Sequence, residues 1–221
     1  MMKTLIATTL LATTLLATSA HGAICTFENL PAPTFTDSYP STGFMYDPLG
    51  AYEGFNFTSS HTVQSSSPYA IFNNKWAYYD LVGGAGLGGY DEAIIGDRAI
   101  FTTWGSNSFY NYRINRNELW RLNSLEVTAV WNPMTMVIEG YRYGEGVFTY
   151  TAQLAAAQRV KLSISSVYPG PLNNITEIKI YGTGISNQIA IDNIDYVVVP
   201  APSALALIGI AGVVGVRRRR R

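Results

Sequence analysis

The chain has 221 residues, of which 48% are hydrophobic and only 14% are charged, and its 15 basic residues balance its 15 acidic ones. Six of the basic residues lie at the two ends, so the body between them carries nine basic against 15 acidic residues, a net charge of about −6. Such a body lacks the basic surface that holds a nucleic acid backbone, and its single cysteine, Cys25, excludes an internal disulfide.

Residues 1–23 have the pattern of a secretory signal peptide. Lys3 precedes an apolar run over residues 5–17, and small residues follow at Ser19, Ala20 and Gly22. We therefore expect export from the cytoplasm, with a signal peptidase cleaving after Ala20 or Gly22. The alternative is that this segment is a buried N-terminal helix.

Residues 24–199 are predicted to form one all-β domain. Short runs of β-branched and aromatic residues predict strands over residues 24–28, 54–57, 93–104, 119–131, 134–141, 147–154, 159–164, 175–181 and 188–198. Apolar and polar residues alternate over 125–131 and 175–180, as in an antiparallel sheet with one face in water. Turn residues at 132–133 and 143–146 separate neighbouring strands. We expect an antiparallel β-sandwich of the jelly-roll type.

Motifs for catalysis are scarce in this body, and we expect it not to be an enzyme. No Gly-x-Ser-x-Gly elbow or zinc-binding His-Glu-x-x-His motif occurs, and His61 stands alone in a polar stretch. A secreted hydrolase stays open as an alternative, because 15 acidic residues could supply the two carboxylates of a glycosidase.

An aromatic stretch over residues 104–113 suggests a site for glycans. Trp104, Tyr110 and Tyr112 lie there among asparagines, serines and Arg113. Flat rings beside amide and guanidinium groups suit sugar recognition, and the sequence predicts these three rings as glycan-binding residues. The alternative is that the rings are buried in the core.

The C-terminal tail has three parts. A proline motif is followed by an apolar run over residues 204–216, which spans about 20 Å as a helix, and then by arginines. That helix is shorter than a bilayer core of about 30 Å, so we expect transient membrane insertion with the arginines in the cytoplasm and the body outside. The tail residues are Val199, Pro200, Ala201, Pro202, Ser203, Arg217, Arg218, Arg219, Arg220 and Arg221.

This order of motif, short apolar helix and arginine cluster resembles the PEP-CTERM sorting signal of Gram-negative bacteria, with Ala201 where that family usually has glutamate. The resemblance implies that residues 200–221 are a sorting signal recognised by an exosortase in the inner membrane. The body would then be a surface or extracellular-matrix protein, found among exopolysaccharide and biofilm components. A simple C-terminal anchor is the alternative.

The body also resembles β-sandwiches that accompany such tails, and jelly-roll carbohydrate-binding modules. The residues that carry this resemblance are Phe27-Glu28-Asn29-Leu30, the segment 52–57 and Ile191-Asp192-Asn193-Ile194. The resemblance implies a carbohydrate-binding module as an alternative function. It also implies one structural Ca²⁺ between the first and last strands, with Glu28 and Asp192 as ligands. The alternative is that Asp192 and Asn193 cap a strand end or a turn.

Overall fold

The structure is a computed structural model that describes residues 22–31, 35–36, 45–59, 76–80, 98–102, 112–183 and 188–200. The expected signal peptide helix and the C-terminal apolar helix lie outside these ranges. None of the helices inside them has the length and apolar composition needed to cross a membrane. The elements are β1 (Gly22–Cys25), β2 (Phe35–Thr36), β3 (Met45–Pro48), β4 (Ala51–Tyr52), β5 (Phe55–Ser59), β6 (Trp76–Asp80), β7 (Arg98–Thr102), β8 (Tyr112–Ala129), β9 (Met134–Arg142), β10 (Glu145–Leu154), β11 (Val160–Ser163), α3 (Ile164–Val167), η2 (Gly170–Asn173), β12 (Asn174–Thr183) and β13 (Ile189–Val198).

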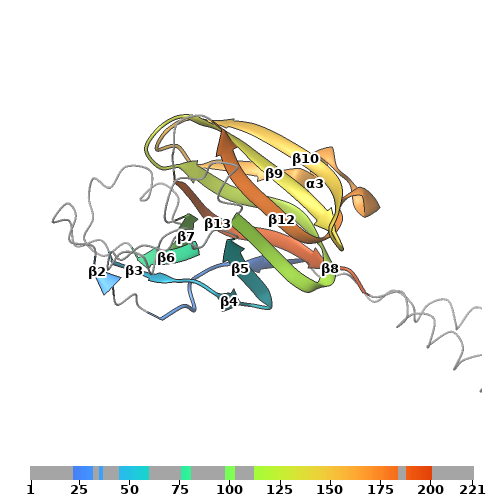
Figure 1. Ribbon diagram of the computed structural model, residues 1–221, viewed down its shortest axis with the longest axis horizontal. Helices are drawn as coiled ribbons and strands as arrows, with labels where there is room; N and C mark the ends of the chain where they lie inside the picture. Colours follow the sequence, from blue (N-terminus) through green and yellow to red (C-terminus); the bar gives the residue numbers. More distant parts are fainter. Residues whose placement is uncertain are drawn as a thin grey trace, which may run out of the picture.

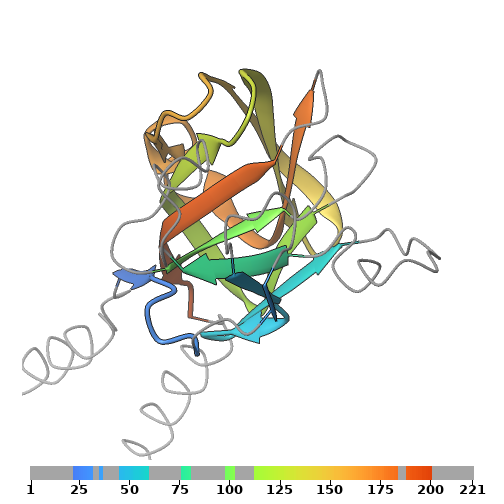
Figure 2. The ribbon, with the colours of Figure 1, turned by 90° about the vertical axis from the view of Figure 1, so that its left-hand side faces the viewer.

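The fold is an antiparallel β-sandwich, which confirms the predicted fold class. The first layer has the order β10-β9-β12-β8, and β5 pairs with the other edge of β8. The second layer continues from β8 through β13, β7, β6, β3 and β2, while β1 pairs with β13. The two layers are seen in Figure 1, and from the side in Figure 2.

Strand β8 belongs to both layers. Its residues 112–115 pair with β12 and β5, whereas residues 124–129 pair with β13 and, in part, with β11. Hydrogen bonding is therefore continuous from one layer to the next, and all 13 strands among the described residues form one sheet by connectivity. The sequence predicted only the second half of this strand, over residues 119–131.

The core lies between the layers and is rich in aromatic rings. Trp120, Phe55 and Tyr112 are fully buried. The ring of Phe55 packs edge-on against Trp120 at 5.1 Å and against Tyr196 at 4.8 Å between centroids. The guanidinium of Arg116 covers the outer side of this group, 4.5 Å from the Phe55 centroid. Burial of each such aromatic side chain stabilises the fold by roughly 1.5–3 kcal/mol.

Two tight hairpins have the same turn chemistry. Tyr143 and Gly144 join β9 to β10 with φ of 50° and 89°, and Glu53 and Gly54 join β4 to β5 with φ of 49° and 78°. Positive φ at both central residues is the geometry that suits two-residue hairpins, and glycine adopts it without strain. The turn predicted at residues 143–146 is thereby confirmed.

Candidate functional site

One face of the first layer carries polar and aromatic side chains instead of apolar ones. Along β12, Ile178 and Ile180 are fully buried, and Lys179 between them points to the opposite side. The register extends this alternation across the layer, because Lys179 pairs with Glu139 of β9 on one side and Arg113 of β8 on the other. We call this surface the outer face. It includes Asn56, Arg113, Asn115, Glu139, Tyr141, Thr149, Glu177, Lys179 and Tyr181.

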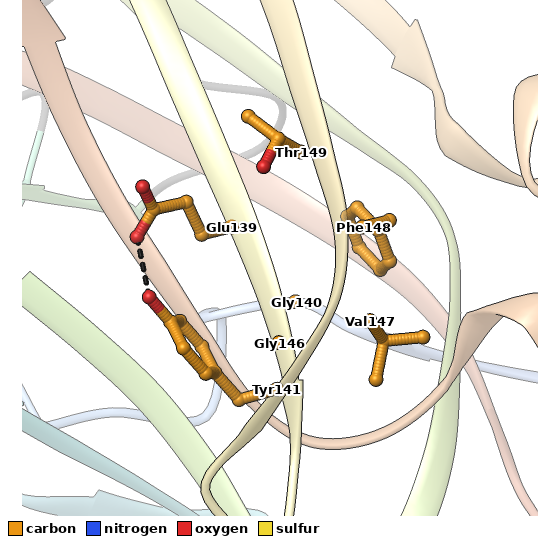
Figure 3. A pocket seen from close by; sticks show the side chains of 7 residues that line it. All are labelled: Glu139, Gly140, Tyr141, Gly146, Val147, Phe148 and Thr149. Atoms are coloured by element: carbon orange, nitrogen blue, oxygen red, sulfur yellow. Dashed lines mark hydrogen bonds between the residues drawn. The ribbon is translucent and has the colours of Figure 1, made fainter.

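Glu139 is the centre of the hydrogen bonding on the outer face. The hydroxyl of Tyr141 donates to its Oε2 at 2.6 Å, which Figure 3 shows, and the hydroxyl of Tyr181 donates to its Oε1 at 2.8 Å. The Nζ of Lys179 lies 3.6 Å from Oε2 and 4.8 Å from the centroid of the Tyr181 ring. One carboxylate thus holds two tyrosine rings and an ammonium group in fixed positions.

A second ion pair lies beside this cluster on the same face. The Nη1 of Arg113 donates to Oε1 of Glu177 at 2.6 Å, and the two side chains are 39% and 21% exposed. Next to it, the amide of Asn56 donates to Oδ1 of Asn115 at 3.4 Å. The outer face therefore presents balanced charges, amides and hydroxyls from neighbouring strands.

The hydrogen bonds to Glu139 fix the protonation states of the cluster. Partial burial by itself would raise the pKa of Glu139, but the hydrogen bonds from Tyr141 and Tyr181 and the charge of Lys179 lower it below its ordinary value. The hydrogen bond to Glu139 raises the pKa of Tyr141 to about 12. Burial, and then the hydrogen bond to Glu139, raise the pKa of Tyr181 to about 12. At neutral pH the carboxylate is ionised and both phenols are protonated.

A hollow of about 460 Å³ next to this cluster is lined by residues of β9 and β10, whose side chains are drawn in Figure 3. Gly140 makes room for the ring of Phe148, since a Cβ at that position would lie 2.2 Å from Cε1 of Phe148. The Phe148 ring in turn stacks on Tyr168 at 4.9 Å between centroids. The hollow is lined by Glu139, Gly140, Tyr141, Gly146, Val147, Phe148 and Thr149.

Of the three aromatic residues that the sequence singled out, the structure describes only Tyr112. Trp104 and Tyr110 lie outside the described residues, and their role in glycan binding stays a prediction. Tyr112, at the start of β8, is fully buried and belongs to the core. Its ring is therefore unavailable to a ligand, which corresponds to the alternative that the sequence left open.

The strands expected to hold calcium do lie side by side. β1 pairs with β13, with Cys25 opposite Ile194. Asp192 is buried, and its Oδ1 accepts the backbone N–H of Asn193 at 2.7 Å. The chain after β1 already meets a cation, because Nη1 of Arg98 donates to the carbonyl oxygens of Glu28, at 2.8 Å, and Leu30.

A calcium site would need more oxygen ligands than the two predicted carboxylates supply. A Ca²⁺ site takes six to eight oxygen ligands, and no group of three or more His, Cys, Asp or Glu side chains suited to a metal occurs within the described ranges. The oxygens that Arg98 engages are the main-chain carbonyls of Glu28 and Leu30, whereas the predicted calcium ligands are the carboxylates of Glu28 and Asp192. A calcium ion held by Glu28 and Asp192 stays a prediction.

The predicted sorting signal begins where the sheet ends. The backbone N–H of Val199 donates to the carbonyl of Leu119 at 2.8 Å, directly after β13. Pro200 follows as the last described residue, while Ala201, Pro202, Ser203 and the arginines from Arg217 to Arg221 lie outside the described residues.

Sequence reasoning missed the residues of the outer face, although one signal for them was present. The alternation over residues 175–180 places Glu177 and Lys179 on the solvent side of a strand. It does not say which strands lie beside them, because register depends on pairings between distant segments. Tyr141 and Glu139 are 36 or more residues away from Glu177 and Lys179 along the chain, and only the fold brings them together.

No family model and no curated protein matches this chain. Among solved structures, it is similar to the CBM22-1 xylan-binding domain of Xyn10C from Paenibacillus barcinonensis, with 13% identity, coverage of 83% of this chain and 99% of that one, and a TM-score of 0.39.

Two further solved structures are similar over most of the chain. The family 11 carbohydrate-binding module from Clostridium thermocellum, in complex with a β-1,3-1,4-mixed-linked tetrasaccharide, has 11% identity, coverage of 70% and 94%, and a TM-score of 0.32. The K1 cleaved adhesin domain of Lys-gingipain from Porphyromonas gingivalis has 10% identity, coverage of 81% and 99%, and a TM-score of 0.26. At these values the likeness identifies no ligand for this chain.

Proposed function

We propose that the body is a carbohydrate-binding domain that takes a glycan on its outer face. The observation that carries this proposal is the pair of tyrosines, Tyr141 and Tyr181, fixed by one carboxylate, Glu139. A sugar presents hydroxyl groups and apolar C–H surfaces, and fixed phenol rings beside polar groups can contact both. Because both hydroxyls already donate to Glu139, ligand binding needs little further ordering of these side chains.

The same contacts argue for binding without catalysis. A glycosidase needs one carboxylic acid with a raised pKa beside a second carboxylate. The pKa of Glu139 is lowered instead, and both of its oxygens accept hydrogen bonds. Glu177 is engaged by Arg113 at 2.6 Å. The two carboxylates of the outer face are therefore held in structural interactions.

The proposal is tested by affinity electrophoresis of the purified full chain in gels that contain different polysaccharides. We expect Tyr141→Ala and Tyr181→Ala each to weaken binding about tenfold, which corresponds to about 1.4 kcal/mol. Tyr143→Ala is the matched control, because Tyr143 is a tyrosine of the β9–β10 turn that is 72% exposed. Retardation by no polysaccharide, or equal loss in all three variants, would contradict a site on the outer face.

For delivery, we propose that an exosortase sorts the protein to the cell surface or the extracellular space, with signal peptidase as the first processing enzyme. The support is the sequence of the two ends, in which the apolar run at 5–17 and the motif, apolar run and arginines after Val199 occur in order. Exopolysaccharide is the ligand that such a location would offer. The two proposals together describe a protein that is sorted to the cell surface and binds glycan there.

A further inference from the structure

The charges of the outer face are neutralised in pairs. Nη1 of Arg113 lies 2.6 Å from Oε1 of Glu177, and Nζ of Lys179 lies 3.6 Å from Oε2 of Glu139. The other members of the face, among them Asn56, Asn115 and Thr149, are uncharged. Within the part of the chain that the structure describes, each cation of this face therefore has a carboxylate partner on a neighbouring strand.

From this pairing we infer that the face selects uncharged glycans over acidic ones. A uronate or sulfate group is held in proteins by an arginine or lysine that can form charge-assisted hydrogen bonds with it. Here Nη1 of Arg113 is already engaged by Glu177, whose side chain is only 21% exposed, so an acidic ligand that draws the guanidinium away leaves this carboxylate without its partner. A half-buried carboxylate without its partner is destabilising, so an acidic ligand gains little net free energy.

An uncharged ligand meets no such penalty. Its hydroxyl groups can add hydrogen bonds to oxygens and amides of the face without disturbing either ion pair, and its C–H surfaces can pack on Tyr141 and Tyr181. Binding to the preferred ligand should consequently depend little on ionic strength.

The inference rests on the proposed function, and the test separates the two. The probes are a polysaccharide that contains uronic acid and its carboxyl-reduced derivative, which has the same chain without the charge. We expect the full chain to bind the reduced form and to bind the native acid at least about tenfold more weakly. Tighter binding to the native acid would overturn the inference and leave the proposed function standing. Retardation by no polysaccharide of either kind would overturn both.

A charge variant tests the pairing itself. Glu177→Gln removes the partner of Arg113, and we expect the ratio of acidic to neutral affinity to rise about tenfold and to fall again with added salt. The matched control is Glu126→Gln, because Glu126 pairs with Arg159 at 3.6 Å on the other layer and the net charge changes equally. A similar rise in the control, or no rise in Glu177→Gln with an unchanged melting temperature, would overturn the inference.

If Glu177→Gln does not fold, Glu139→Gln serves as the second variant, because it removes the partner of Lys179. Because Glu139 also holds Tyr141 and Tyr181, the readout for this variant is the affinity for the native acid itself, which we expect to rise. The absence of that rise in a folded protein counts against the inference.

Discussion

Glu139 raises the pKa of Tyr141 and of Tyr181, and this effect can be measured as a function of pH. The pKa of Tyr141 and that of Tyr181 are both raised to about 12, against about 10 for a free tyrosine. A group whose pKa is raised on folding stabilises the fold fully below its unfolded pKa. The contribution of these hydrogen bonds should therefore be complete below about pH 10 and be lost as the pH rises towards 12.

We expect a spectrophotometric titration of the folded protein to show tyrosines that ionise late, among them Tyr141 and Tyr181. In Glu139→Gln these two should titrate nearer 10, because the carboxylate that accepts both hydroxyls is gone. Glu118→Gln is the control, since Glu118 is exposed and pairs with Arg116. Unchanged late titration in Glu139→Gln would contradict the assigned hydrogen bonds.

Arg98 is the residue whose removal should loosen the chain after β1. Its Nη1 bonds the carbonyls of Glu28 and Leu30, and a hydrogen bond to a charged group contributes about 1.5–3 kcal/mol. We expect Arg98→Met to lower the free energy of unfolding by about 2–4 kcal/mol in chemical denaturation. A loss below about 0.5 kcal/mol would show that these bonds are dispensable.

The same region decides the calcium prediction. A bound Ca²⁺ would stabilise the fold by about 2.7 kcal/mol at about 100 times its Kd. If Glu28 and Asp192 hold the ion, the melting temperature of the wild type should be higher in Ca²⁺ than in chelator, and Asp192→Ala should abolish this difference. Equal melting temperatures of the wild type in the two buffers would contradict the calcium prediction.

At the scale of single elements, the β9–β10 hairpin depends on a residue without a side chain. A Cβ on Gly140 would lie 2.2 Å from the Phe148 ring, which stacks on Tyr168. We expect Gly140→Ala to displace this ring and to destabilise the fold by about 1–3 kcal/mol in chemical denaturation. Gly146→Ala is the matched control, since its Cβ would meet nothing within 4 Å. Equal effects in the two variants would contradict this reading of the contact.

How far the sequence predicts such elements depends on how local their signal is. Alternation predicted the strand at 175–180, and the turn residues Tyr143 and Gly144 predicted a hairpin, because each of these patterns is contained in a few residues. The first half of β8 was missed, since Arg116, Asn117 and Glu118 interrupt its alternation. It is held as a strand by β5 and β12. The outer face was missed for the related reason that its members meet only through register.

At the scale of the whole molecule, the two ends of the body lie side by side. β1 and β13 are antiparallel, with Gly22 opposite Val197. The first residue of β1 and the end of β13 therefore lie next to each other. The predicted signal peptide and the predicted sorting tail therefore attach at one edge. A body held at a membrane by either end would have the same edge towards the membrane, and both cleavages would release the same part of the fold.

This arrangement narrows the expected processing sites. β1 begins at Gly22, and its four residues pair with β13, while the N–H of Val199 is bonded to Leu119. We expect the mature protein to start at or before Gly22, which favours cleavage after Ala20, and to end at or after Val199. Intact-mass analysis of the exported protein checks both ends. A start at Ile24 would mean that half of β1 is dispensable, and a mature surface protein that still carries Arg217 to Arg221 would refute sorting by cleavage and leave a simple anchor.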